Sequence, residues 1–330
     1  MSQLISTVSF IITIRLYVEV TKMTTEYQPE LQATAKDLDE AKRVLAAGAD
    51  AVFVGNQQFG NRIAGDFSIA MIEEITQFAH ELDKKVYVMV NAIYHNEHLQ
   101  TLPDYLIAIN DMQVDGIVAG DQSIYQLLQD LDVSLPLIWN PATLSTNYQT
   151  LRFWSARGLR RAALSNELRL DASIEIKQHL DRAVDIQVHG MTCIFQSKRK
   201  LVKNYYDHID RPYDPEIERY IREDKKSETH YPIFEDSNGT HIMSTEDLMM
   251  IDYLDEILAG KIDGLKIEGL LKSTDYNEQI VKIYREAIDA YLDDPAVYQM
   301  KKAGYRQAIY QIQPDARKLN TGFYFKEQIY

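Results

Sequence analysis

Short apolar runs alternate with amphipathic segments along most of the chain, from residue 30 onward. Runs such as Ala51–Gly55 have the length and β-branched content of buried strands, and segments such as Phe67–Leu82 have apolar residues at helical spacing. This alternation predicts repeated βα units around a parallel sheet. The predicted strands are Leu31–Ala35, Ala51–Gly55, Val86–Val90, Gly116–Ala119, Leu137–Trp139, Arg161–Leu164, Ile186–Val188 and Gly264–Ile267. The predicted helices are Asp37–Ala47, Phe67–Leu82, Leu102–Met112, Ser123–Leu131, Asn147–Ala156, Ala172–Leu180, Glu246–Leu258 and Asp275–Tyr291.

The alternation breaks between the seventh and eighth predicted strands, where residues 197–243 are charged and rich in tyrosine. Within this insertion, Tyr231–Phe234 and Thr240–Met243 flank the sequence Asp-Ser-Asn-Gly, which favours a β-hairpin. Eight βα units favour an α/β fold of the closed (β/α)8 TIM-like type, with residues 29–330 as its domain. An open doubly wound sheet is the alternative, but the sequence lacks the G-x-G-x-x-G and G-x-x-x-x-G-K-[ST] motifs that would support it.

The first residues differ from the rest of the chain. Leu4–Val20 is apolar, but Arg15 and Glu19 interrupt it, no basic segment precedes it and no small-residue cleavage pattern follows. Its uncharged part is shorter than the roughly 20 residues of a transmembrane helix. We expect a poorly packed extension over residues 1–28, and a start codon assigned upstream of Met23 is one explanation. A membrane anchor is the weaker alternative.

Charge and cysteine content narrow the possible functions. The 330-residue chain has a formal net charge of −14, which disfavours a broad electrostatic surface for phosphate. Contact with nucleic acid therefore needs a local basic patch or a partner. The single cysteine excludes an internal disulfide and any metal or iron–sulfur site built from several cysteines of this chain alone. We expect a cytoplasmic protein that holds no metal by itself.

In a barrel of this type the active site lies at the carboxyl ends of the strands, and several polar residues follow predicted strands. Proton transfer is the candidate role for His189, Glu167 and Glu268. The polar residues at this end are Asn91, Asp121, Asn140, Glu167, His189 and Glu268, with Arg62 in the second loop and Lys266 two positions before Glu268. Of these, Arg62, Asn91 and Lys266 are candidates for binding an anionic ligand.

Each of these residues also has an ordinary structural interpretation. Asp121 and Asn147 are well placed to cap the helices that follow them. A lone histidine at a strand end, such as His189, is commonly a hydrogen-bonded structural residue. Cys193 is either a thiolate assisted by Lys198 and Arg199 or a small buried apolar residue.

One compact basic cluster stands out in the acidic chain. Lys198, Arg199 and Lys200 are followed by Lys203, with Tyr205 and Tyr206 just beyond, in the sequence SKRKLVKNYY (197–206). Phosphate binding combined with aromatic stacking is one interpretation, and a solvated charged face is the other. The tyrosines are equally typical of a protein interface.

Several ordered motifs resemble the collagenase-like peptidase family U32. They extend over nearly the whole chain from about residue 30, and their order matches that of the family. The motifs are GADAVFVG (48–55), Phe59 to Arg62, LSTN (144–147) with Phe153-Trp154, ALSNEL (163–168), VHGMTC (188–193), STEDL (244–248), LKIEG (265–269) and TGFY (321–324).

The resemblance implies two activities. The family name implies a peptidase, in which the carboxylates at the barrel mouth, His189 and Cys193 would supply the chemistry. Other members hydroxylate RNA, including those that make 5-hydroxyuridine at the tRNA wobble position with prephenate as a required metabolite. Many of those members carry four cysteines for an iron–sulfur cluster.

This chain departs from the family at the cysteines. The family's Gly-Arg-Cys is replaced by Lys198-Arg199-Lys200, a second cysteine position holds Met249, and only Cys193 remains. Arg-Glu appears as Asn166-Glu167, and Glu-Gly-Arg as Glu268-Gly269-Leu270. The pattern is similar to short, cysteine-poor members that accompany a longer, cysteine-containing paralogue. It implies a heteromeric tRNA hydroxylation pair, with a non-catalytic scaffold as a further alternative.

Overall fold

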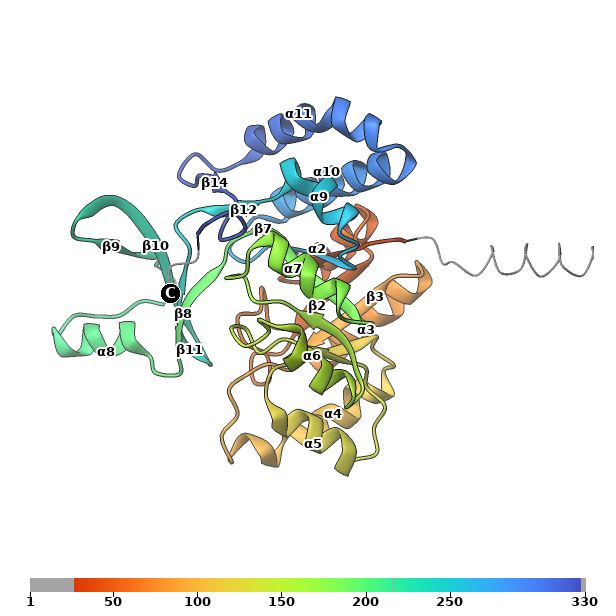
Figure 1. The fold of residues 1–330 in the computed structure, drawn as a ribbon. Helices are drawn as coiled ribbons and strands as arrows, with labels where there is room; N and C mark the ends of the chain where they lie inside the picture. The colour runs from red at the N-terminus through yellow and green to blue at the C-terminus, as the bar shows by residue number, and fades with distance from the viewer. Residues whose placement is uncertain (1–26, 216, 328–330) are drawn as a thin grey trace, which may run out of the picture.

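The computed structural model describes residues 27–215 and 217–327. Parallel strands pair in chain order from the first to the seventh, and the last strand pairs with both the seventh and the first (Figure 1). The sheet therefore closes into an eight-stranded barrel, which confirms the predicted fold and excludes the open sheet. The barrel strands are β1 (Glu30–Thr34), β2 (Ala51–Gly55), β3 (Lys85–Met89), β4 (Gly116–Ala119), β5 (Leu137–Trp139), β6 (Leu159–Ala163), β7 (Ala183–Gly190) and β13 (Gly264–Glu268).

Helices between the strands cover the outside of the barrel, and aliphatic side chains buried between the two layers form the main core. Several of these helices begin at a polar cap, and the Asp121 and Asn147 side chains accept hydrogen bonds from Ser123 N and Thr150 N, at 2.8 and 2.9 Å. The capping interpretation of these two residues is confirmed. The helices of this layer are α2 (Leu38–Ala46), α3 (Ile69–Glu81), α4 (Leu102–Asp111) after the short η1 (His98–Gln100), α5 (Gln122–Asp130), α6 (Tyr148–Ser155), α7 (Leu170–Gln178) and α10 (Thr274–Asp293).

The insertion builds a second sheet beside the barrel mouth. The sheet has the order β8-β11-β10-β9, and it begins at Cys193, ahead of the predicted boundary at residue 197. A tight turn from Asp236 to Gly239 joins β10 and β11, so the predicted hairpin is present. Figure 1 shows α8 and the β9–β10 ribbon projecting from the barrel. These elements are β8 (Cys193–Ser197), α8 (Leu201–His208), β9 (Arg219–Glu223), β10 (Lys226–Asp236) and β11 (Gly239–Met243).

The predicted helix Glu246–Leu258 is wrong in its first half. Asp247–Met249 forms the short strand β12, which pairs antiparallel with β7, and helix α9 (Leu254–Ala259) follows after η2 (Ile251–Tyr253). The reason is tertiary: Asp247 is fully buried and ion-paired with side chains far along the chain. Local sequence pattern does not report such partners.

The structure adds a terminal segment that the sequence pattern did not predict. Helix α11 (Pro295–Ile312) packs along α10, and β14 (Leu319–Asn320) pairs parallel with β12. The predicted extension over residues 1–28 falls almost entirely outside the described residues. In the part of the chain that the structure describes, every helix is too short or too polar to cross a membrane.

Candidate functional site

A cavity of about 460 Å3 occupies the barrel interior and opens at the carboxyl ends of the strands. Its two sides differ in chemistry. The side formed by β2 to β5 is apolar, and the side formed by β7, β13 and β1 is polar. The apolar side presents Phe53, Met89, Val118 and Ile138, and the polar side presents Gln32, Asp185, Gln187, Lys266 and Glu268. The cavity therefore suits a ligand with one apolar face and one hydrogen-bonding edge.

Lys266 and Glu268 form an ion pair on β13, with Nζ and Oε2 2.9 Å apart. Glu268 is 8% exposed, and its second oxygen accepts hydrogen bonds from Thr34 Oγ1 at 2.9 Å and Leu270 N at 3.2 Å. These partners fix the position of the carboxylate beside Lys266. Lys266 also lies over the Phe53 ring, 5.3 Å from its centre, so a fixed cation faces the cavity.

Arg62 reaches the cavity from the loop after β2, and its backbone has a left-handed φ of 53°. Its guanidinium donates a hydrogen bond to Gln196 Oε1 on β8, which joins the loop to the second sheet. Asn91 supports the same loop, since its Oδ1 accepts from Asn61 N at 2.8 Å. Together these contacts hold the cation at the cavity although its backbone conformation is unfavourable for a non-glycine residue.

A buried amide makes further hydrogen bonds between the second sheet and the Arg62 loop. Asn238, in the turn between β10 and β11, donates through Nδ2 to Gln57 O and Gly60 O, both at 2.8 Å. Asn238 is 2% exposed, so these bonds are shielded from water. The insertion is therefore part of the cavity wall, and it positions the loop that carries Arg62.

Cys193 lines the cavity at the start of β8, where its thiol contacts Phe195 O at 3.3 Å. Burial raises the pKa of this thiol, and the nearby Arg62 guanidinium only partly offsets the effect. The thiol is therefore neutral near pH 7. This environment does not activate a cysteine nucleophile.

His189 does not reach the cavity. Its ring is fully buried outside the barrel, where Nε2 lies 2.7 Å from the Tyr276 hydroxyl and the Tyr284 ring packs edge-on. Burial lowers the pKa of His189 to about 3, so the ring is neutral. The prediction placed it at the mouth because it ends a predicted strand, whereas in the structure β7 continues through it. The register of β7 against β13 shifts between Gln187 and His189, and this bulge turns His189 away.

The remaining predicted residues divide into two groups. Glu167 is exposed at the cavity rim, and its neighbour Asn166 donates to Gln187 Oε1 at 3.0 Å. The structure thus brings together seven predicted residues around the cavity: Arg62, Asn91, Asn140, Glu167, Cys193, Lys266 and Glu268. The basic cluster Lys198, Arg199 and Lys200 lies in the turn between β8 and α8, outside the cavity lining.

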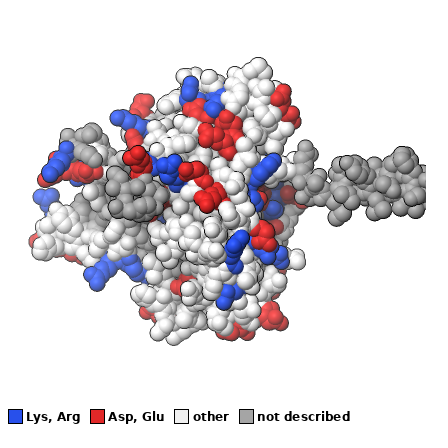
Figure 2. Space-filling model, viewed as in Figure 1, with Lys and Arg blue, Asp and Glu red and all other residues white. Residues whose placement is uncertain are grey.

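The surface around these elements mixes both charges. Figure 2 shows Lys and Arg interspersed with Asp and Glu over the visible face, rather than one broad positive area. Helix α8 buries none of its side chains, and Tyr205 on it is 60% exposed. A nucleic acid would therefore meet a small basic and aromatic patch at this helix, not an extended positive surface.

Sequence reasoning missed the polar residues deep in the cavity. Gln32, Asp185 and Gln187 lie within strands, and none of them was named as a candidate for the site. A buried strand that keeps polar residues at inward positions is the signal that would have indicated them. It becomes readable only when the inward face of each strand is known.

The described residues do not form a metal centre. They contain no group of three or more His, Cys, Asp or Glu side chains placed to hold a metal ion. Cys193 is the one thiol of the sequence, so a cluster held by four thiolates does not fit this chain on its own.

The fold and the site define an α/β-barrel protein with a cavity, polar on one side and apolar on the other, at the carboxyl ends of its strands. The model of peptidase family U32 matches residues 36–329, and the chain belongs to that family. It is 41% identical over 309 residues to "tRNA hydroxylation protein P2" of Bacillus subtilis, covering 92% of this chain and 99% of the relative. It is 31% identical over 280 residues to "tRNA hydroxylation protein P1" of the same organism, covering 83% and 66%.

A third relative, "tRNA hydroxylation protein P" of Escherichia coli, is 28% identical over 309 residues, covering 80% of this chain and 68% of the relative. A solved U32 peptidase superposes with a TM-score of 0.46 at 13% identity, covering 74% of this chain and 94% of that structure.

Proposed function

We propose that this chain takes part in the hydroxylation of tRNA in the cytoplasm, at C5 of the wobble uridine. The observation that carries the proposal is the 41% identity to a tRNA hydroxylation protein, which extends over 99% of that relative. The alignment length matters because it leaves no large part of the relative without a counterpart here. The amphipathic barrel cavity supports the proposal, since it suits a small unsaturated ring with polar substituents.

Prephenate is the proposed metabolite of the cavity. It is a cyclohexadiene with a hydroxyl and one carboxylate on the ring and a second carboxylate at the end of a side chain. Arg62 and Lys266 would bind the carboxylates, with Asn91 supporting the Arg62 loop, and the apolar side formed by Phe53 and Met89 would contact the ring. Glu268 would keep Lys266 oriented toward the bound anion through the 2.9 Å ion pair. Glu167 at the rim is the proposed group for proton exchange with solvent.

The basic cluster Lys198, Arg199 and Lys200 is the proposed contact with tRNA phosphates. It lies at the exposed start of α8, next to Tyr205, on the side of the molecule where the second sheet projects. A short patch of cations with an exposed aromatic ring is a common arrangement for single-stranded RNA. It would compensate locally for the acidic charge of the whole chain.

A cysteine-containing paralogue is the proposed partner. The single thiol of this chain does not fit an iron–sulfur cluster, so redox chemistry that needs one would come from the second protein. Relatives named P1 and P2 occur together in Bacillus subtilis, and the P1 relative is the longer of the two. If this chain is only a scaffold for that partner, its cavity residues would be dispensable.

Peptidase activity is the weaker alternative, suggested by the family name. Burial raises the pKa of Cys193, and His189 lies outside the cavity. The cavity acid Glu268 is ion-paired with Lys266. None of these is arranged as an activated nucleophile and base.

Deleting the gene and measuring nucleosides by mass spectrometry tests the proposal. We expect 5-hydroxyuridine derivatives in tRNA to fall, and to return with the wild-type gene but not with Lys266→Met. Lys301→Met, an exposed lysine on α11, is the matched control and should restore the modification. Unchanged tRNA in a strain without a redundant paralogue, or cleavage of collagen-derived peptides that depends on Glu268, contradicts the proposal.

A further inference from the structure

Two buried side chains at the floor of the cavity have oxygen atoms without a hydrogen-bond partner. Gln32 on β1 is 0% exposed and Asp185 on β7 is 3% exposed, and both line the cavity. Gln32 Oε1 and Asp185 Oδ2 are the unpartnered atoms. Buried polar atoms normally find a partner, so two unpartnered acceptors on residues that line one cavity point to a ligand that supplies a donor.

The hydrogen bonds around Gln32 and Asp185 show which of their atoms lack a partner. Gln32 Nε2 donates to Glu30 Oε1 at 2.9 Å, so flipping the amide would set two acceptors against each other. Asp185 Oδ1 accepts from Arg161 Nη1 at 3.1 Å, which leaves Oδ2 as the carboxylate oxygen without a partner. Gly264 on β13 leaves room for both groups, because a Cβ there would lie 1.9 Å from Asp185 Oδ1 and 2.8 Å from Gln32 Nε2.

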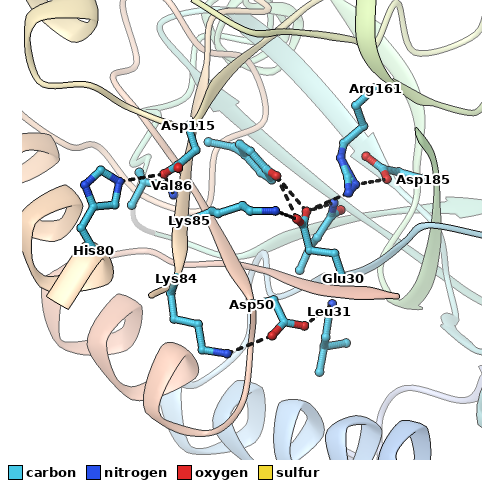
Figure 3. A network of polar contacts seen from close by, with 12 residues as sticks. Glu30, Leu31, Asp50, His80, Lys84, Lys85, Val86, Asp115, Arg161 and Asp185 are labelled. Atoms are coloured by element: carbon cyan, nitrogen blue, oxygen red, sulfur yellow. Dashed lines mark hydrogen bonds and ion pairs between the residues drawn. The ribbon is translucent and has the colours of Figure 1, made fainter. Parts of the chain in front are cut away.

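The two carboxylates below the cavity floor, Glu30 and Asp185, do not have the same number of cationic partners. Arg161 lies between Glu30 and Asp185, 3.1 Å from an oxygen of each (Figure 3). Glu30 has a second cation in Lys85 at 2.5 Å, and a further hydrogen bond from Tyr87 at 2.9 Å. Asp185 has fewer partners, namely its share of Arg161 and a side-chain hydrogen bond from Gln32, and its Oδ2 atom has none. It is thus the acceptor of this network that a ligand donor would stabilise most.

We propose that the cavity floor is a subsite for a pyrimidine base, in which the imide N3–H of the target uridine donates to Asp185 Oδ2. Gln32 Oε1 is the adjacent acceptor, and Val118 and Ile138 on the opposite side pack against the ring face. Lys266, Phe53 and Met89 stay available to the proposed metabolite. The inference rests on the proposed function, because it names how that function's substrate enters the site.

The shape of uridine agrees with this placement. The ribose is attached at N1, and the N3–C4 edge lies on the opposite side of the ring. A base that enters through the mouth therefore presents N3–H and O4 to the floor while the ribose stays near the rim. C5, the atom to be hydroxylated, then faces the side of the cavity rather than the floor.

Binding of a matched pair of nucleotides to the full chain tests the subsite. Uridine 5′-monophosphate keeps the imide hydrogen, and its 3-methyl derivative lacks it. We expect the methyl derivative to bind at least about tenfold more weakly, as for loss of a hydrogen bond to a charged group. Equal binding of the two nucleotides, or no binding of uridine monophosphate at millimolar concentration, overturns the inference.

Variants make the assignment specific to the floor. Asp185→Asn should weaken uridine monophosphate by about tenfold and remove the preference over the methyl derivative. Gln32→Met removes the second acceptor of the floor without touching Arg161, and it should also weaken binding of uridine monophosphate. It provides the test if Asp185→Asn fails to fold. Glu81→Gln, an exposed acid at the end of α3, is the control. A preference that survives both floor variants contradicts the proposal.

The same variants separate this inference from the proposed function. If the gene is needed for tRNA hydroxylation but Asp185→Asn and Gln32→Met both support it fully, the subsite is wrong and the function stands. If deletion leaves tRNA unchanged, the proposed function fails whatever the nucleotides do.

Discussion

The Nδ2 atom of Asn238 lies 2.8 Å from the carbonyl oxygen of Gly60, although the two residues are 178 positions apart. The first belongs to the hairpin of the insertion and the second to the loop that carries Arg62. The contact explains how an insertion outside the barrel contributes to the wall of the barrel cavity. It also makes the position of the Arg62 guanidinium dependent on a buried amide in another sheet.

Replacing Asn238 by alanine should loosen the Arg62 loop. The change leaves the buried carbonyl oxygen of Gly60 without this donor, at a cost of about 1–3 kcal/mol in the free energy of unfolding, while the Gln57 carbonyl keeps its hydrogen bond from Ser237 Oγ. Hydrogen exchange should rise in residues 56–62 and in the turn at 236–239. Asn204→Ala, which truncates an exposed asparagine on α8, is the control. Unchanged exchange in both segments would show that the hairpin does not hold the loop.

Replacing Glu268 by glutamine should impair the cavity without unfolding the barrel. Glutamine keeps an acceptor for Thr34 but removes the charge that orients Lys266. We expect tRNA hydroxylation in cells to fall by about tenfold, because a buried charge pair loses one partner. Thermal denaturation checks the fold, and wild-type levels of the modified nucleoside would contradict a role for this pair.

The single cysteine makes thiol reactivity easy to follow. Burial raises the pKa of Cys193 above its ordinary value of 9.0, so the thiolate fraction of the folded protein at pH 7 is lower than in the unfolded chain. Iodoacetamide should label the native protein more slowly than the denatured protein at neutral pH, and the labelling rate of the native protein should level off at a higher pH. Mass spectrometry measures both rates. Rapid native labelling at pH 7 would support the peptidase alternative, as would loss of activity in Cys193→Ala.

The stability of the protein should depend on the protonation of Asp185. Burial raises its pKa to about 7, despite Arg161, and Glu30 and Asp263 act in the same direction as burial. Folding therefore favours the protonated form, and this contribution is complete below about pH 4 and lost as the pH rises through about 7. The stability of wild type relative to Asp185→Asn should fall between about pH 5 and pH 8. Urea titrations at both pH values measure it, and a constant or rising difference would show that the carboxyl is ionised throughout.

The basic cluster at α8 gives a prediction on salt dependence. If Lys198 and Lys200 contact phosphates, replacing each by glutamine should weaken tRNA binding and lower the slope of log affinity against log salt by about one. Lys301→Gln on α11 should change neither. Filter binding of the chain with its paralogue at several salt concentrations makes the measurement. An unchanged slope would show that the cluster is a solvated face.

Much of the barrel was predictable because its signals are local. The bounds of Ala51–Gly55 were predicted correctly. A short β-branched run followed by a glycine-containing loop can be recognised as a strand before its partner strands are known. The same holds for the caps at Asp121 and Asn147 and for the turn at 236–239. Where a distant ion pair decides the conformation, as for Asp247 with Lys272 and Arg317, the local prediction of a helix was wrong.

The site was predictable only in part, and the reason is geometric. The sequence by itself determined that polar residues follow the strands of a closed barrel, and it therefore indicated Arg62, Asn91, Glu167, Lys266 and Glu268. It also determined that the chain has too few thiols for a cluster. Only the tertiary structure decided which way each side chain faces. One bulge in β7 sends His189 into a tyrosine-lined core, while Gln32 and Asp185, from strands separated by β13, meet over the missing side chain of Gly264. Register and strand closure depend on contacts between distant segments, and no local pattern encodes them.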